Sequence, residues 1–110
     1  MLRQFDLTSS FNVTTLNPAM ITFDPRKRAE TLLGRGLDFA DAARVFAGPT
    51  VTVEDDRRDY GEKRWITLGL LANRAVVMVW TPRQSARRII SMRHAHEDEV
   101  EEFGSRVGRW

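Results

Sequence analysis

The spacing of apolar residues changes near the middle of the chain, from a helical period to a strand period. Asp24 followed by Pro25 is typical of a helix start, because aspartate caps free backbone N–H groups and proline suits the first helical position. A helix is therefore predicted over residues 26–33, and a glycine follows it. Asp38 can cap a second helix over residues 39–47, where apolar residues recur at helical spacing.

The second half of the chain has the pattern of β-strands joined by turns. Strands are predicted over residues 50–53, 64–71, 75–81 and 88–92. The third of them is apolar at both alternating sets of positions, as in a central strand covered on both faces. An acidic stretch beginning at Glu97 is predicted to form a closing helix. This order predicts an α+β fold with two N-terminal helices, a four-stranded antiparallel sheet and a C-terminal helix.

The composition is that of one globular domain. Of the 110 residues, 42% are hydrophobic and 29% are charged. Residues 1–19 are polar and nearly uncharged, so we interpret them as an N-terminal extension outside the core and residues 20–110 as a single domain. No apolar run approaches the roughly 20 residues that a membrane-spanning helix needs. Without cysteine, a thiolate nucleophile or metal site is excluded, and a cytoplasmic protein fits best.

Basic residues gather in one part of the chain, in a pattern that suits an anion. Strict alternation in the fourth strand would place Arg87 and Arg93 on one face and Arg88 on the other. Arg64 opens the second strand and Arg83 follows the third, so these side chains, with Lys27, are predicted to converge on a phosphate. The alternative is that arginines at strand ends serve solubility and protect the sheet edge.

Other candidate chemistry is sparse. His94 and His96 can titrate near neutrality and serve as acid or base. The aspartates of the loop over residues 54–61 lack the partners of a calcium loop, so a solvated acidic loop is expected. Tyr60 in that loop either reaches a site by its hydroxyl or packs the turn. We predict neither a metal site nor a cofactor.

Four separated motifs resemble those of the BrnT family, which are toxins of bacterial type II toxin–antitoxin pairs. They are FDPRK (23–27), GLDFADAARVF (36–46), GEKR (61–64) and RIISMRHA (88–95). The resemblance implies a fold similar to RelE-type ribonucleases and cleavage of RNA without a metal. It also implies a partner, a ribbon-helix-helix antitoxin of the BrnA type that binds the toxin in a hetero-oligomer.

The resemblance also implies which residues form the site. The family's first-helix lysine, the arginine of its Gly-Glu-x-Arg motif and its strand arginines fall on residues of this chain. We predict a catalytic set around the scissile phosphate, made of Lys27, Arg64, Arg83 and Arg93. Further contacts to RNA are predicted for Tyr60, Arg87 and Arg88. The group that accepts the proton is left unassigned.

The chain departs from the family pattern at several positions. Phe23 stands where the family has a tryptophan, and Thr31 where its first helix commonly has an asparagine. Where the family closes its first helix with Lys-His-Gly, this chain has Gly34-Arg35-Gly36, and its closing helix is acidic instead of basic. A second interpretation therefore stays open, a catalytically impaired protein that binds the antitoxin. A third is a plain RNA-binding module. Growth arrest on expression separates the enzyme from both.

Overall fold

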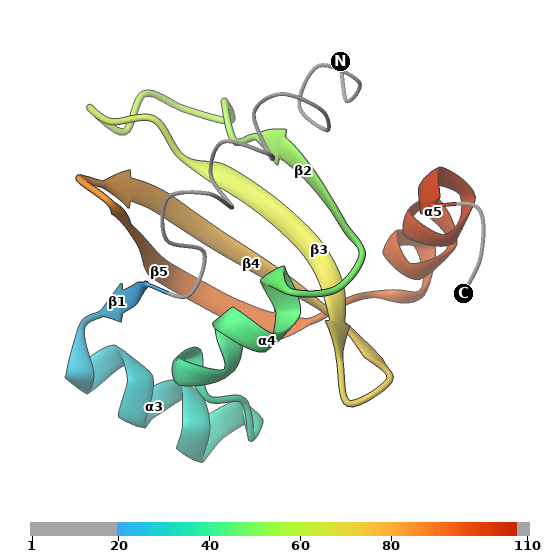
Figure 1. The fold of residues 1–110 in the computed structure, drawn as a ribbon, viewed down its shortest axis with the longest axis horizontal. Coiled ribbons are helices and arrows are strands. Elements are labelled where there is room, and N and C mark those ends of the chain that lie inside the picture. The colour runs from blue at the N-terminus through green and yellow to red at the C-terminus, as the bar shows by residue number, and fades with distance from the viewer. Residues whose placement is uncertain (1–19, 108–110) are drawn as a thin grey trace.

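The computed structural model describes residues 20–107, which form one twisted sheet flanked by helices (Figure 1). The proposed extension over residues 1–19 lies outside the described residues. The strands pair in the order β1-β5-β4-β3-β2. Their bounds are β1 Ile21–Phe23, β2 Thr50–Glu54, β3 Trp65–Leu71, β4 Arg74–Arg83 and β5 Ala86–His94. The helices are α3 Pro25–Arg35, α4 Ala42–Phe46 and α5 Glu97–Val107, with a 3-10 turn, η2, at Phe39–Asp41.

The prediction of a four-stranded, fully antiparallel sheet was wrong, because a fifth strand makes the sheet mixed. Strand β1 pairs in parallel with β5, with Ile21 opposite Arg87 and Phe23 opposite Ile89. Its three residues are too few to show an alternating period in the sequence. The other four strands pair antiparallel, and β4 lies in the middle of the sheet as its apolar sequence predicted. The α+β class is confirmed.

The first predicted helix is confirmed, and the second was wrong in its form. The Asp24 carboxylate accepts a hydrogen bond from the Arg26 N–H at 3.0 Å, as expected of an N-cap. The second segment is not one helix but η2 followed by the short α4. Its fully buried residues, Phe39, Ala42 and Val45, are three positions apart, so they lie on one side of the segment.

The main core lies between the sheet and the layer formed by η2 and α4. It joins three of their residues, Phe39, Ala42 and Val45, to strand residues that are almost fully buried, Val76, Met78, Ile89 and Met92. Phe23 of β1 packs edge-on against Phe39, with ring centroids 6.1 Å apart. The helix α5 instead lies beside β2 at the far end of the sheet (Figure 1).

A β-bulge in β5 overturns the predicted division of its arginines between two faces. Val79 pairs with Ser91 but Trp80 pairs with Ile89, so the register between β4 and β5 slips by one residue. Ile89 and Met92 consequently both face the core although they are three positions apart. Arg87 and Arg93, predicted to share a face, therefore lie on opposite faces of the sheet. Arg93 shares its face with Arg88 instead.

Arg87 lies on the core side of the sheet. Its guanidinium carbon is 4.1 Å from the ring centroid of Phe46 and 5.3 Å from that of Trp80. Burial lowers the pKa of this guanidinium. Packing against two aromatic rings makes Arg87 part of the support under the sheet, on the side away from the face that carries Arg88.

Candidate active site

Basic side chains from four separate segments line one open pocket at the edge of the sheet. They are Lys27 from α3, Arg64 from the loop before β3, Arg83 from the end of β4 and Arg88 from β5. The remaining lining residues are Asp24, Glu62, Ile89 and Ile90. The pocket therefore combines four cations with two carboxylates.

Strand pairing explains why these segments meet. The parallel pairing of β1 with β5 places Phe23 opposite Ile89, and α3 begins two residues after Phe23, so Lys27 comes close to β5. Thr81 of β4 pairs with Arg88, which places the end of β4 beside the same part of β5. The Thr81 hydroxyl donates to the Lys63 carbonyl at 2.8 Å and so ties the loop that carries Arg64 to this strand end.

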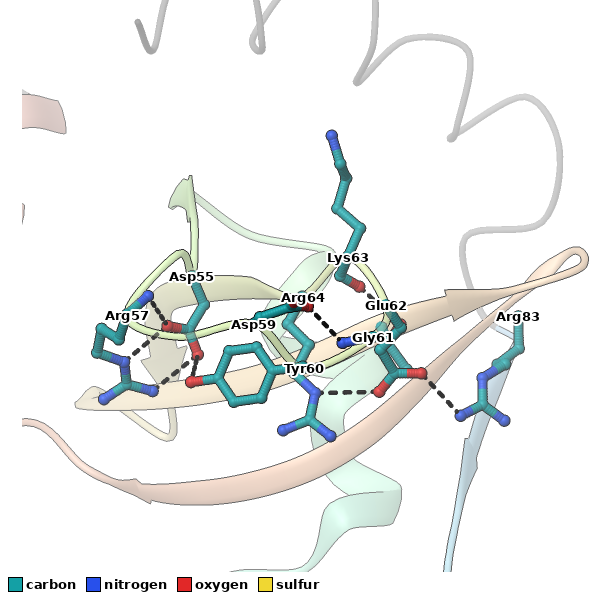
Figure 2. A network of polar contacts seen from close by, with 10 residues as sticks. Asp55, Arg57, Asp59, Tyr60, Gly61, Glu62, Lys63, Arg64 and Arg83 are labelled. Carbon is teal, nitrogen blue, oxygen red and sulfur yellow. Dashed lines mark hydrogen bonds and ion pairs between the residues drawn. The ribbon is translucent and has the colours of Figure 1, made fainter.

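Glu62 joins two of the pocket's guanidiniums (Figure 2). Arg64 Nε donates to one of its carboxylate oxygens at 3.0 Å, and Arg83 Nη2 donates to the other at 3.2 Å. The hydrogen bond from Arg64 is the main cause that lowers the pKa of Glu62 from its usual value, and the bond from Arg83 adds to it. Glu62 is therefore ionised at neutral pH and orients both arginines.

Lys27 and Arg88 complete the pocket with uncompensated charge. Within residues 20–107, no carboxylate lies within ion-pair distance of either side chain. Asp24, the pocket's second carboxylate, accepts a hydrogen bond as the N-cap of α3. With one carboxylate shared by Arg64 and Arg83, the pocket carries a net positive charge, which favours a phosphate over a neutral ligand.

The loop between β2 and β3 holds Arg64 in place through a buried carboxylate, Asp55. Its side chain is only 1% exposed, so the expectation of a solvated acidic loop was wrong for this residue. The carboxylate accepts hydrogen bonds from Arg57 Nε at 2.6 Å, from Arg57 Nη2 at 2.7 Å and from the Tyr60 hydroxyl at 3.1 Å (Figure 2). The guanidinium carbon of Arg64 lies 4.2 Å from the centroid of the Tyr60 ring.

A family model described as ribonuclease toxin, BrnT, of type II toxin–antitoxin system matches residues 23–99. The chain belongs to the BrnT family. No curated protein matches the chain. The matched range includes every residue that lines the pocket, and it confirms the resemblance drawn from the four sequence motifs. Membership in this family makes an antitoxin the expected partner and RNA the expected substrate of the BrnT-family chain.

The structure brings together part of the catalytic set predicted for this BrnT-family chain. Lys27, Arg64 and Arg83 all line the pocket, together with Arg88, which was predicted only to contact RNA. Arg93 does not line it. Its guanidinium makes two hydrogen bonds of 2.9 Å to the carboxylate of Glu99 in α5.

The two histidines also lie outside the pocket lining. Burial, with a smaller contribution from the charge of Arg74, lowers the pKa of His94. His96 is exposed, and its backbone N–H donates to Glu99 at 2.8 Å, in the position of a helix cap. In the part of the chain that the structure describes, no three His, Cys, Asp or Glu side chains are grouped so as to hold a metal ion. Over the same residues, no helix is long and apolar enough to cross a membrane.

Sequence reasoning missed Glu62 as a site residue of this BrnT-family chain. It belongs to the Gly-Glu-x-Arg motif, and its position two residues before Arg64 was a usable signal. Residues two apart in an extended segment point the same way, so their opposite charges suggested a pair. The bond from Arg83 had no such signal, because it joins residues 21 positions apart.

The fold of this BrnT-family chain should lose stability in acid because three carboxylates bind arginines. Pairing with Arg28, Arg57 and Arg93 lowers the pKa of Asp38, Asp55 and Glu99, respectively, each to about 2. Since these values lie below those of the unfolded chain, the stabilisation is complete above about pH 5 and is lost as the pH falls towards 2. The melting temperature should therefore stay level from pH 7 to pH 5 and fall steeply between pH 4 and pH 2.

Asp55→Asn tests this assignment at one carboxylate. The lowered pKa of the nearly fully buried Asp55 corresponds to about 2 kcal/mol. The variant should melt lower than the parent at pH 7, and the difference should shrink as the pH approaches 2. A difference that stays constant over this range would show that the Asp55 charge is not what stabilises the fold.

Proposed function

We propose that the chain is the toxin of a type II toxin–antitoxin system and that it cleaves RNA in the pocket lined by Lys27, Arg64, Arg83 and Arg88. The observation that carries this proposal is the convergence of four cations, from four segments, on one pocket in which a carboxylate, Glu62, binds two of them. Such a site can surround a phosphodiester, since guanidiniums match phosphate oxygens in a two-pronged geometry and the ammonium adds a point charge.

The proposed reaction is attack of the ribose 2′-hydroxyl on the adjacent phosphorus. The 2′-oxygen forms a bond to phosphorus, the bond to the 5′-oxygen breaks, and a 2′,3′-cyclic phosphate results. Negative charge builds on the phosphate oxygens in the transition state, where Arg64 and Arg83 are the preorganised donors. Single donors of this kind contribute about 3–4 kcal/mol in other enzymes. The proposed mechanism takes its main rate gain from these charges and needs no metal.

Glu62 is our candidate for the proton acceptor. It is ionised at neutral pH and lies between the two guanidiniums, so its carboxylate can take the proton of the 2′-hydroxyl while the leaving 5′-oxygen takes up a proton from solvent water. Its lowered pKa makes it a weaker base than one matched to neutral pH. The arginines therefore contribute more to the proposed rate than Glu62 does.

The departures from the family pattern, Phe23 and Thr31 included, fall outside the pocket lining, which favours the active enzyme over the impaired one. Arg35 stands at the position of the family's helix-closing histidine. Its guanidinium donates to the Met92 carbonyl at 2.8 Å, so here it joins α3 to β5. The acidic helix α5 contributes no pocket residue, and its Glu99 binds Arg93. None of these changes removes a cation from the site.

The proposed partner is a small ribbon-helix-helix antitoxin of the BrnA type, bound in a hetero-oligomer. The exposed acidic residues of α5, Glu97, Asp98 and Glu101, offer a basic partner a complementary surface. RNA as the substrate places the proposed action in the cytoplasm.

Induced expression of the chain alone tests this function. Growth should stop within one or two generations, and total RNA taken at intervals should show new fragments whose 5′ ends carry a hydroxyl. Co-expression of a neighbouring gene with a ribbon-helix-helix sequence should restore growth, and the two proteins should co-purify in a salt-sensitive complex. The Arg64→Ala variant, expressed to the same level, is the matched control.

The alternatives predict different results. Normal growth and intact RNA, with a stable complex, would identify the impaired antitoxin-binding protein. RNA binding without cleavage or a complex would identify the plain RNA-binding module. Either outcome would remove the assignment as a ribonuclease.

A further inference from the structure

Two residues that do not line the pocket, Asp55 and Tyr60, influence the direction of the Arg64 guanidinium, which does line it. The Arg64 side chain contacts the Glu62 carboxylate at 3.0 Å and lies over the Tyr60 ring at 4.2 Å from its centroid. A carboxylate bound to one edge and an aromatic ring within cation–π distance together restrict the position of a guanidinium. The Tyr60 ring is thus one of two contacts that set its direction.

Asp55 fixes Tyr60 and the backbone of Arg64 at the same time. Its carboxylate accepts the Tyr60 hydroxyl hydrogen bond at 3.1 Å, and its backbone N–H donates to the Arg64 carbonyl at 2.8 Å. Figure 2 shows the Tyr60 hydroxyl bound to Asp55 and the Arg64 side chain beside the Tyr60 ring. The backbone bond from Asp55 to Arg64 closes a cycle of contacts through these three residues. Because Asp55 is buried and directly follows β2, this cycle of contacts is attached to the sheet.

We propose that Asp55 and Tyr60 are positioning residues that aim Arg64 at the scissile phosphate. The proposal rests on the proposed ribonuclease function and assigns Tyr60 a role different from RNA contact. The Arg64 guanidinium already occupies one face of the Tyr60 ring, so a base cannot stack on that face. The hydroxyl, the ring's polar group, donates its hydrogen bond to the Asp55 carboxylate, and Tyr60 does not line the pocket.

Loss of the Tyr60 side chain is expected to lower the rate of the chemical step. Misplacing a catalytic group by about 1 Å can slow a reaction by about 10²-fold. Tyr60→Leu should therefore lower kcat by about 10- to 100-fold while changing KM by less than about threefold. A base-stacking role predicts the reverse, a raised KM with kcat unchanged.

A double-mutant cycle between Tyr60 and Arg64 separates positioning from a general structural role. Cleavage of a fluorescent RNA oligonucleotide that contains every dinucleotide step is measured for Tyr60→Leu, for Arg64→Ala and for the double variant. If Tyr60 acts through Arg64, Tyr60→Leu should slow the Arg64→Ala enzyme by less than about twofold. An equal slowing in both backgrounds would overturn the proposal, as would an unchanged kcat in the single variant.

Two further variants keep the test independent of misfolding. Tyr60→Phe keeps the ring and loses only the bond to Asp55, so its kcat should lie between that of Tyr60→Leu and that of the parent. Arg58→Ala is the matched control, because Arg58 also lies over the Tyr60 ring, at 5.6 Å, but does not line the pocket. Its kcat should equal that of the parent. A loss of rate in Arg58→Ala as large as in Tyr60→Leu would count against positioning through Arg64.

A proton NMR spectrum distinguishes failure of this proposal from failure of the proposed function. The ring current of Tyr60 should move the δ-methylene signals of Arg64 upfield, and Tyr60→Leu should remove the shift while Tyr60→Phe keeps it. If the parent protein shows the shift but cuts no RNA, the ribonuclease function fails and the positioning contact stands. If the shift is absent from the parent, the contact itself is overturned, whether or not RNA is cut.

Discussion

Arg64→Ala should abolish growth arrest and slow RNA cleavage by about 10²–10³-fold, the largest effect expected of any single change. Two neighbours hold the Arg64 side chain in the pocket: it binds Glu62 and lies over Tyr60. Removing a preorganised donor from a site where charge develops costs a few kcal/mol of barrier, and each 1.36 kcal/mol is a factor of ten in rate. Arg64→Lys should recover only part of the rate, because an ammonium lacks the planar fork of donors.

Arg93→Ala is the matched comparison, since Arg93 was predicted from the sequence to act in the same set. Its guanidinium binds Glu99 in α5 and does not line the pocket. We expect this variant to lose stability and to keep cleaving RNA at a rate within about tenfold of the parent, because no pocket donor is removed. Both variants should still bind the antitoxin.

The measurement is the cleavage rate of purified, folded protein, with circular dichroism as the control for folding. Equal, large losses of rate in folded Arg64→Ala and Arg93→Ala would show that the active site extends beyond the pocket to Arg93. If both variants cleave RNA at the parent rate, the pocket is not the active site. The arginines would then serve solubility and protect the edge of the sheet.

The sequence predicted the elements that have a clear period or a clear cap. Alternation located β2 to β5, the doubly apolar stretch identified β4 as a central strand, and Asp24 with Pro25 marked the start of α3. Each of these signals lies within one short segment, so neighbouring residues are enough to read it. The three residues of β1 carry no such signal, and only pairing with β5 makes them a strand.

The bulge in β5 shows why the arrangement of the arginines could not be predicted. An alternating pattern fixes which residues share a face only while the register is regular, and one extra residue reverses every assignment beyond it. The slip between Val79 and Trp80 therefore separates Arg87 from Arg93. No residue in the sequence marks this slip, because it depends on how β4 and β5 fit together.

The pocket depends on two features that could not be predicted from the sequence, the pairing of β1 with β5 and the bulge in β5. Lys27 comes close to Arg88 because β1 pairs with β5, and Arg88 faces outwards with the register that the bulge sets. Burial of Asp55 was not predicted, since a charged loop is normally solvated. Its arginine and tyrosine partners lie only two and five positions away, so the loop could have been read as a carboxylate held by its neighbours.

The second large effect concerns α5, whose acidic sequence gave little indication that it packs against the sheet. Glu99 of α5 binds Arg93, and the side chain of Phe103 is only 1% exposed. Phe103→Ala removes a fully buried aromatic side chain and leaves a cavity, so the free energy of unfolding should fall by about 3–5 kcal/mol. Chemical denaturation, followed by tryptophan fluorescence, measures this change.

Leu33→Ala is the matched control, because Leu33 is 91% exposed and its truncation removes almost no buried surface. It should change the free energy of unfolding by less than about 0.5 kcal/mol. Since α5 lines no part of the pocket, Phe103→Ala protein that remains folded at low temperature should cleave RNA at close to the parent rate. Equal stability of the two variants would show that α5 does not pack on the domain. A large loss of cleavage in folded Phe103→Ala would instead mean that the acidic helix supports the active site, and that its departure from the basic family pattern has changed the enzyme.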